Sequence, residues 1–322
     1  MSTDAQHQGE HADRGAGPSG GATGLDSPDR PAAPLAFRPL STGRKVRNNL
    51  ATVLVTLAFL VAVVPLVWVI VTVVGRGIRA IVSADWWSRS LNGVLPESFA
   101  GGVYHAIYGT IIQALLAAVI AVPIGILAAV YLVEYGRGRL ARTTSFMVDI
   151  LAGVPSIVAA LFVFAAFISI LGAEQSAFMV SLALVLLMLP VVIRNTEEML
   201  RLVPDELREA SYALGIPKWK TILRIVLPTA LSGTVTGVML ALARVMGETA
   251  PVLVLVGYSQ SINFDPFSGN MASLPLLMFS ELSNPEPAGQ FRIWGAALTL
   301  ILIIMILQLG ASVVSRFSAI SK

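Results

Sequence analysis

Long apolar segments that carry almost no charge constrain the fold of this chain more than any other feature of its sequence. The clearest runs from residue 50 to 74, LATVLVTLAFLVAVVPLVWVIVTVV, without one acidic or basic side chain. A helix of about 20 apolar residues spans the hydrocarbon core of a bilayer. Charged residues make up only 13% of the chain, whereas soluble domains carry about 25%. Apolar side chains must therefore face lipid as well as one another, which predicts an all-α integral membrane protein.

Six segments reach or approach the length of a transmembrane helix. We expect the first such helix within residues 44–75 and five more within residues 76–322. The spans are approximately 50–74, 107–133, 146–171, 176–193, 229–256 and 293–314. Residues 1–43 are rich in Gly, Pro, Ala, Ser and Asp and have no apolar periodicity, which predicts a disordered tail. No short apolar core with a cleavage site precedes the first span, so we do not expect this tail to be a cleaved signal.

The placement of Lys and Arg predicts the orientation of the spans, because cytoplasmic loops carry an excess of both. Basic residues gather at the N-terminus, in the loops 137–142 and 201–224, and near the C-terminus. The opposite loops hold only Arg76, Arg79, Arg89 and Arg292. We therefore expect a multi-pass protein of the cell inner membrane with both termini in the cytoplasm. In the outer loop 258–290, the apolar stretch 274–279 is expected along the membrane surface.

Composition also excludes several classes of function. The chain has no cysteine, which rules out disulfides, thiolate metal sites and cysteine catalysis. Its isoelectric point is about 9.4, a value that nucleic-acid-binding proteins share. The positive charges flank apolar spans and form no patch, so they indicate membrane topology and no nucleic-acid partner.

A polar insert follows the fourth span and reads EASYALGIPKWKTILRIVLP over residues 209–228. Asp205 is expected to cap a short helix, which Gly215 ends as the first residue past its C-cap. Pro217 then begins a second helix, so short helices are predicted at about 205–226. Small residues such as Ala210 and Ser211 suit docking into a groove of another protein, whereas a passive, solvated loop helix is the alternative.

The spacing of this insert resembles the cytoplasmic coupling motif of ABC-type importer permeases. That motif is EAA, three residues, Gly, nine residues and I-x-L-P; the matching positions are Glu209, Ala210, Gly215, Ile225, Leu227 and Pro228, with Ser211 in place of the second Ala. The resemblance implies that these residues contact a separate ATPase subunit. The chain contains no G-x-x-x-x-G-K-[ST] sequence. We therefore expect that this chain is a transporter subunit and not an enzyme, and that it binds no cofactor. ATP and Mg are expected on the partner ATPase.

Four charged residues lie within or at the ends of the spans. Asp149 lies in the third, Arg194 at the inner end of the fourth, and Arg244 and Glu248 in the fifth. A charge at the bilayer centre costs about 2.5–3.5 kcal/mol on insertion scales, so its presence indicates function. In a continuous helix Arg244 and Glu248 share a face and either neutralise each other or bind a ligand.

The chemistry of these residues suits an oxyanion. A guanidinium binds two phosphate or sulfate oxygens at once. Our hypothesis is that the Glu248 carboxylate accepts the remaining proton of hydrogen phosphate, which sulfate lacks. At 1.5 Å per residue, Arg244 lies roughly 22 Å along its helix from Thr229, near midplane if that helix starts below the bilayer. Arg194 then lies nearer the cytoplasmic exit. Asp149 is expected to pair with Arg194, as a closed gate or as a static salt bridge.

The sequence around these charges resembles the PstA-type permeases of phosphate ABC importers, over residues 44 to 316. The resemblance is carried by GGVYHAIYGT at 101–110, LAGVPSIVAAL at 151–161, LPVVIRNTEEMLRLVP at 189–204 and ALARVMGETAPVL at 241–253. It implies a type I ABC importer permease fold and ATP-driven phosphate import by alternating access. It also implies roles for Arg194 and Arg244 in phosphate passage, with Glu248 as the acidic residue of the motif.

The same resemblance implies three kinds of partner: a homologous second permease, two ATPase subunits and an extracytoplasmic phosphate-binding protein. Within this class, import of sulfate or molybdate is an alternative that competition with labelled phosphate would test. A secondary transporter or channel is another, although it predicts internal repeats and leaves the insert unexplained. A membrane scaffold that signals phosphate status is a third, compatible with transport.

Overall fold

The computed structural model describes residues 42–320, with side chains as far as Val313, and the chain is helical throughout this range wherever it is regular. The helices are α1 Thr42–Ile81, α2 Ala84–Ser88, α3 Tyr104–Val130, η1 Tyr131–Tyr135, α4 Gly138–Ala152, α5 Ser156–Val163, η2 Phe164–Ile170, α6 Ala177–Arg201, α7 Asp205–Ala213, α8 Lys218–Thr221, η3 Ile222–Val226, α9 Leu227–Met246, α10 Ala250–Leu255, α11 Leu274–Glu281 and α12 Pro287–Ile320. The predicted tail lies outside the described residues, except that Thr42 and Gly43 already belong to α1.

Five continuous helical segments are long and apolar enough to cross a bilayer: 42–81, 104–135, 177–201, 218–246 and 287–313. They contain five of the six predicted spans, in whole or in large part. The third prediction, 146–171, is wrong as a straight helix, because α4 and the segment made by α5 and η2 meet at 105°. Pro155 has no backbone N–H and disfavours the helical conformation of Val154 before it. Together with Gly153, it ends α4 and starts α5 in a new direction.

The fifth predicted span, 229–256, is also interrupted. α9 ends at Met246, and residues 247–249 separate it from α10. Glycine has low helix propensity, and Pro251 lacks the N–H that would bond the carbonyl of Gly247 in a continuous helix. Pro251 is instead tolerated in the first turn of α10, where that N–H is not needed. The helix therefore stops before Glu248.

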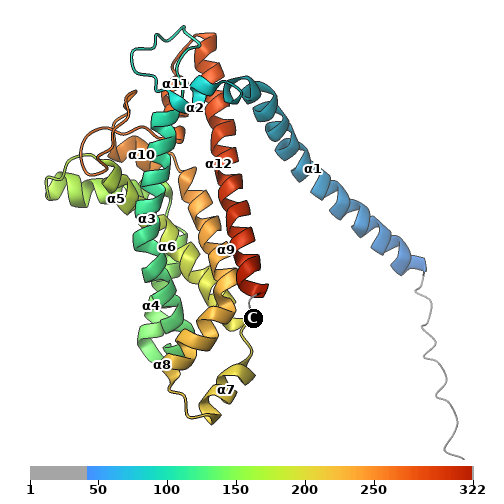
Figure 1. Cartoon of the computed structure of the whole chain (residues 1–322). Coiled ribbons are helices and arrows are strands. Elements are labelled where there is room, and N and C mark those ends of the chain that lie inside the picture. Colours follow the sequence, from blue (N-terminus) through green and yellow to red (C-terminus); the bar gives the residue numbers. More distant parts are fainter. Residues whose placement is uncertain (1–41, 321–322) are drawn as a thin grey trace, which may run out of the picture. The chain divides into compact units, whose positions relative to one another are not determined.

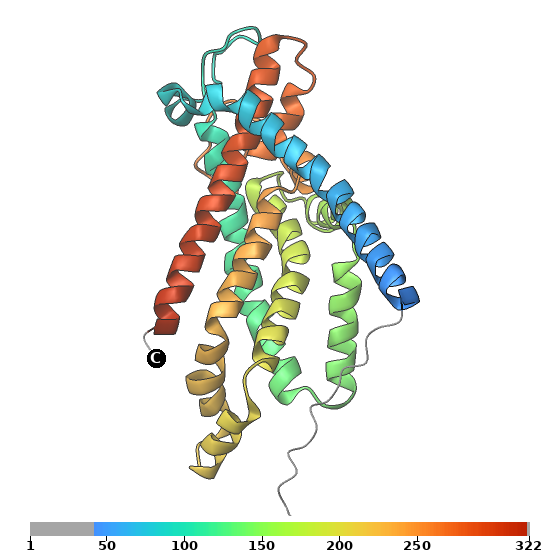
Figure 2. The same cartoon turned by 90° about the vertical axis from the view of Figure 1, so that its right-hand side faces the viewer.

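The described residues divide into two parts between Val61 and Ala62, and the packing described here is that within the second. α6 is its central helix: 67% of the most apolar window of α6 is buried, against 17% for α12. α3 and α9 pack along α6, and α12 packs on α9 (Figures 1 and 2). The short helices α7 and α8 lie at one end of this part, and α2 and α11 at the opposite end (Figure 1).

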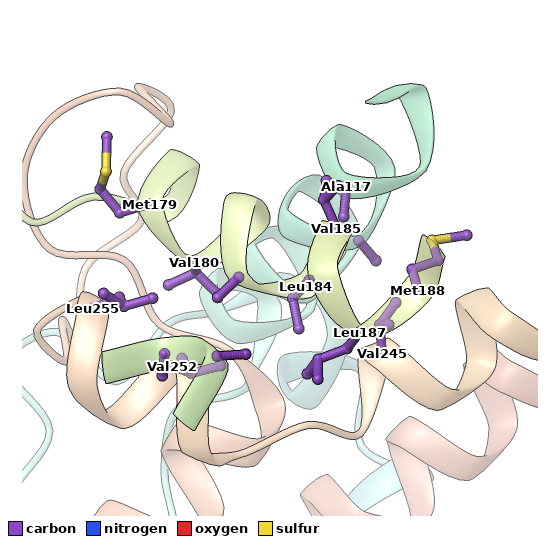
Figure 3. Packing of buried hydrophobic residues seen from close by; sticks show 14 of the residues in the cluster. Ala117, Met179, Val180, Leu184, Val185, Leu187, Met188, Val245, Val252 and Leu255 are labelled. Carbon is purple, nitrogen blue, oxygen red and sulfur yellow. The ribbon is translucent and has the colours of Figure 1, made fainter. Parts of the chain in front are cut away.

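Small residues on α3 allow it to approach α6 closely. Ala114, Ala117, Ala118 and Ala121 follow helical spacing and are all buried, and a Cβ added to Gly125 would lie 2.7 Å from Val192 Cγ1. Because lipid tails are as apolar as leucine, helices in membranes associate through such tight packing. Leucine, valine and methionine side chains of α6 fill the space toward α3, α9 and α10 (Figure 3).

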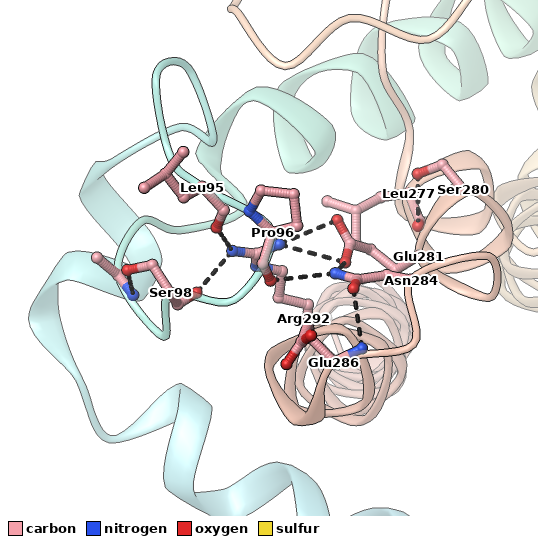
Figure 4. A network of polar contacts seen from close by, with 10 residues as sticks. Leu95, Pro96, Ser98, Leu277, Ser280, Glu281, Asn284, Glu286 and Arg292 are labelled. Atoms are coloured by element: carbon pink, nitrogen blue, oxygen red, sulfur yellow. Dashed lines mark hydrogen bonds and ion pairs between the residues drawn. The ribbon is translucent and has the colours of Figure 1, made fainter.

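A buried ion pair closes the end of the molecule that carries α11. Arg292 of α12 is 3% exposed and donates hydrogen bonds to both carboxylate oxygens of Glu281, at 3.3 and 3.2 Å. It also donates to the carbonyls of Leu95 at 3.1 Å and Ser98 at 2.7 Å, so three segments meet at one guanidinium (Figure 4). The expectation that 274–279 lies along the membrane surface is wrong, since four of its six residues, Leu274 to Leu277, are buried in the protein.

We predict that Gly109→Ala destabilises the protein by about 1–3 kcal/mol, the usual cost of overpacking. The added Cβ would lie 1.9 Å from the backbone carbonyl oxygen of Ala272, which cannot rotate away. Thermal unfolding of the purified protein in detergent measures the effect. Gly75→Ala in α1 is the matched control, because a Cβ there meets no atom within 4 Å. Equal unfolding temperatures for the two variants would contradict this account of the packing.

Candidate functional site

Arg244 is an exposed charge in the last turn of α9. Thr236 and Leu240, eight and four residues earlier on the same side of α9, are exposed as well, so the arginine lies on the face of α9 that points away from the core. Its guanidinium makes no hydrogen bond or ion pair with any residue between 42 and 313. The carbonyl groups at the C-terminal end of a helix favour a cation, which lowers the cost of keeping this arginine charged. All its donors remain available to a ligand.

Glu248 does not share a helix face with Arg244, so the expectation that both lie on one continuous helix is wrong. The glutamate lies in the break after α9, where its own N–H bonds the Val245 carbonyl at 3.2 Å. Its side chain is half-buried. The break between α9 and α10 thus keeps the two charges from neutralising each other within a regular helical turn.

The predicted contact between Arg194 and Asp149 is confirmed, and it is part of a larger cluster. Arg194 on α6 forms ion pairs with Asp149 on α4 and, at 2.8 Å, with Glu197. It also donates to the carbonyl and hydroxyl oxygens of Ser145, at 3.1 and 3.0 Å. One guanidinium therefore connects α4 to α6, and any role in phosphate passage requires it to release some of these contacts.

Sequence reasoning missed Glu197, although its spacing offered a signal. Residues three apart on a helix are neighbours, and Glu197 follows Arg194 at that distance with its side chain buried. Within residues 42–320, no group of three or more His, Asp or Glu side chains is arranged to hold a metal ion.

The polar insert forms a compact lobe, α7 with α8, which we call the coupling lobe. α7 starts at Asp205, so Pro204 is its N-cap residue and the predicted cap at Asp205 is wrong. The carboxylate of Asp205 instead lies in the first turn, where the helix dipole favours negative charge. Gly215 follows the helix with φ +75°, as its predicted place past the C-cap requires. Pro217 precedes α8, as expected.

Ser211, expected to face a partner, points into the lobe instead, and so does Arg208. Arg208 donates to the carbonyls of Val203 at 2.7 Å and Leu200 at 2.9 Å. The Ser211 hydroxyl is buried and lies 2.8 Å from that of Thr221, which connects α7 to α8. Both side chains therefore stabilise the shape of the lobe and are unavailable to another protein.

The outward surface of the lobe is formed by other residues. Glu209, Ala210 and Gly215 are exposed, and Leu214 is 80% exposed. Leu227 and Pro228, the last two positions of the motif, are half-buried in the first turn of α9. The first positions of the motif therefore lie on the exposed surface of the coupling lobe, and its last positions lie in the first turn of α9.

Glu134 anchors the coupling lobe to the second span. Its carboxylate is 5% exposed and lies 3.0 Å from Arg208 and 3.9 Å from the Lys218 ammonium. The same ammonium lies 4.8 Å from the centre of the Tyr135 ring. A carboxylate between two cations is the arrangement that makes a buried charge tolerable. The lobe is thereby held to η1, which continues directly from α3.

At the opposite end, the loop between α10 and α11 is held by its own polar side chains. Asp265 accepts hydrogen bonds from the Phe267 N–H at 2.9 Å and the Ser268 hydroxyl at 2.7 Å. These donors hold the pKa of the Asp265 carboxyl below its usual range. The turn exposes the rings of Phe264 and Phe267, and the loop therefore presents an apolar surface of defined shape.

The sequence of the chain matches a known protein family and close relatives in it. The model of the family described as "Binding-protein-dependent transport system inner membrane component" matches residues 121–318. The "Phosphate transport system permease protein PstA 1" of Mycobacterium tuberculosis (strain CDC 1551 / Oshkosh) is 63% identical over 297 residues, covering 92% of this chain and 97% of that protein. The "Phosphate transport system permease protein PstA" of Mycobacterium leprae (strain TN) is 65% identical over 280 residues, covering 87% and 92%.

Solved structures share the fold at much lower identity. A bacterial alginate ABC transporter, solved with a pentasaccharide-bound periplasmic protein, aligns with a TM-score of 0.58 and 13% identity, over 85% of this chain and 97% of that chain. The inward-facing MetNI methionine ABC transporter aligns with a TM-score of 0.53 and 21% identity, over 67% and 94%. The fold is therefore that of type I ABC importer permeases.

We predict that Glu134→Gln loosens the coupling lobe. The substitution keeps the shape but removes the buried one of the two carboxylates paired with Arg208, which weakens the contact between the lobe and η1 by about 1–3 kcal/mol. Hydrogen exchange of the amides in 205–226 should then quicken about tenfold or more. Glu206→Gln, an exposed acid in the first turn of α7, is the control and should exchange as the wild type does. Unchanged exchange in Glu134→Gln would show that the lobe does not depend on this anchor.

Proposed function

The chain belongs to the family of binding-protein-dependent transport system inner membrane components and is a PstA-type permease. From this premise we propose that it forms one wall of an ATP-driven pathway that imports inorganic phosphate. The observation that carries the proposal is the 63% identity to a phosphate permease over 92% of the chain. The permease itself is no enzyme, so the energy must arrive through a contact with another subunit.

Arg244 is the proposed phosphate ligand within the pathway. It is the exposed cation of α9 that none of the described side chains neutralises, and its planar guanidinium matches two oxygens of an oxyanion. Glu248, within the break, is placed by its sequence position to accept the proton of hydrogen phosphate. This carboxylate would disfavour sulfate, which offers no proton at neutral pH.

Arg194 provides a second stage on the cytoplasmic side in this proposal. Its contacts with Asp149 and Glu197 leave little of the guanidinium for phosphate in the described conformation. Asp149 is the more exposed of the two acids and is the one that an arriving anion displaces most readily. Opening of α4 away from α6 would then free Arg194 and open the exit.

The coupling lobe is the proposed attachment point for the ATPase. Its exposed residues Glu209, Ala210 and Leu214 form the contact surface, and the Glu134 anchor transmits displacement to α3. Since η3 and α9 continue directly from α8, the same displacement moves the helix that carries Arg244. Alternating access follows as a rigid rocking of α3 and α9 with the lobe.

The remaining partners are proposed because this chain forms only one side of the transport pathway. An exposed charge on a membrane helix requires a polar neighbour, which we assign to a homologous second permease, and two ATPase subunits then serve the pair. The loop with exposed Phe264 and Phe267 faces an extracytoplasmic phosphate-binding protein. Both termini lie in the cytoplasm in this arrangement, as the distribution of Lys and Arg predicts.

We predict that Arg244→Ala reduces phosphate uptake at least tenfold, because a hydrogen bond to a charged group contributes about 1.5–3 kcal/mol. Arg244→Lys should transport at an intermediate rate, since it retains the charge without the planar fork. Uptake of labelled phosphate by the reconstituted complex measures both, and excess sulfate or molybdate tests selectivity. Arg142→Ala, an exposed arginine on α4, is the control. Normal uptake by both Arg244 variants would exclude the arginine from the pathway.

We also predict that Leu214→Asp prevents association with the ATPase. The side chain is 80% exposed, so the variant should fold, while a carboxylate in the contact would remain unpaired. Co-purification of the ATPase with tagged permease measures the loss. Leu282→Asp, on a leucine that is 69% exposed at the opposite end, should retain the ATPase. Retention by both variants would place the ATPase contact elsewhere.

A further inference from the structure

A polar cavity lies behind the coupling lobe, on the side facing the second span. Its volume is about 420 Å³, and its walls come from the end of η1, the turn after it, the end of α6, and helices α7 and α8. Charged side chains dominate the lining: Glu134, Arg137, Arg201, Asp205, Arg208 and Lys218. We call it the lobe cavity. It is separate from the outward surface around Leu214 that we assign to the ATPase.

The charges around the lobe cavity do not balance. Arg208 is paired with Glu134 and Asp205, both at 3.0 Å, and Lys218 also faces Glu134. Those two cations therefore have carboxylates, and the two carboxylates are used. Arg137 and Arg201 form no ion pair or hydrogen bond with any side chain or backbone atom that the structure describes. Two guanidinium groups from different segments thus line one cavity with unused donors.

The lobe cavity lies at the end of a membrane-spanning segment, where phospholipid headgroups are expected. The second membrane-spanning segment ends at Tyr135, which lines the cavity together with Tyr212. Tyrosine is enriched at membrane–water interfaces, and basic pockets beside the cytoplasmic ends of spans bind anionic headgroups. Arginine recognises a phosphate group through paired hydrogen bonds. Two arginines and two tyrosines at this depth therefore favour a phosphate-bearing ligand.

We propose that the lobe cavity binds a phosphate group between Arg137 and Arg201, and that its occupancy regulates transport. The group is carried by an anionic phospholipid or is free inorganic phosphate in the cytoplasm, and the same two guanidiniums serve either source. A bound phosphate connects the turn after η1 to the end of α6, next to the Glu134 anchor. This inference rests on the proposed function for the placement of the cavity on the cytoplasmic side.

The consequence differs between the two sources. A lipid headgroup is a constant part of the membrane, so it would hold the lobe in its coupled position, and transport would rise with the content of anionic lipid. Free phosphate is the imported product, so its binding beside the lobe would lower transport as cytoplasmic phosphate accumulates. In both cases removal of the two arginine side chains weakens the response and leaves the Arg244 pathway intact.

The test uses the assembled importer in vesicles, with the binding protein outside and ATP inside. In one arm the vesicles contain phosphatidylcholine with increasing phosphatidylglycerol, and in the other they contain phosphatidylcholine alone with increasing inorganic phosphate inside. The initial rate of labelled phosphate uptake is compared for wild type and for the double variant R137Q/R201Q. Each basic residue near an anionic surface contributes about fivefold to binding. In the arm that contains the true ligand, the amount of phosphatidylglycerol or inorganic phosphate that gives half of the maximal change in uptake rate should therefore be about 25-fold higher for R137Q/R201Q than for wild type.

Matched variants separate a local site from a general effect of charge. R142Q/R139Q removes the same charge from exposed arginines at the start of α4 that do not line the cavity, and it should respond as the wild type does. R137K/R201K retains the charges and should recover part of the response. Equal responses of wild type and R137Q/R201Q in both arms would overturn the proposal, as would a wild type that responds in neither arm. A wild type without ATP-dependent uptake would instead refute the proposed function.

Discussion

The close packing of α3 against α6 is the contact on which the rest of the structure depends. Helices in a bilayer gain little from burying apolar side chains, because lipid is equally apolar. Alanines on α3 and Gly125 permit the backbones to approach, and α6 becomes the helix around which α4, α5, α9 and α10 pack. This rigid centre allows neighbouring elements to be broken without loss of the fold.

The two breaks are therefore accommodated within a stable frame. α4 turns into α5 at Pro155, and α9 turns into α10 after Gly247. The two short helices that follow, α5 and α10, pack against each other. Backbone that leaves the helical conformation at membrane depth is tolerated where protein or a polar cavity covers it. Arg244 precedes one of these breaks directly, which connects the irregular backbone to the proposed route of phosphate.

Charged side chains have two distinct tasks in this chain. Arg208, Glu134, Arg292 and Glu281 are nearly buried and paired, and they hold the coupling lobe and α11 onto the helical frame. Arg244, Arg137 and Arg201 are exposed and unpaired within the described part of the chain, so their donors remain for an anion. Burial with a partner thus separates the charges that stabilise the fold from those available for binding.

The sequence alone determined the membrane class, five of the six spans, the coupling lobe with its Gly215 turn, and the contact of Arg194 with Asp149. These follow from local quantities: the length of an apolar run, the conformational preference of glycine, and a charge that needs a partner. Only the tertiary structure decided that Arg208 and Ser211 point inward, that Glu197 joins Arg194, and that Glu248 lies beyond the end of α9. Helical spacing assumes a continuous helix, and it cannot report which side of an amphipathic helix meets its neighbours. The direction of a side chain and the place where a helix breaks depend on contacts between residues far apart in the chain.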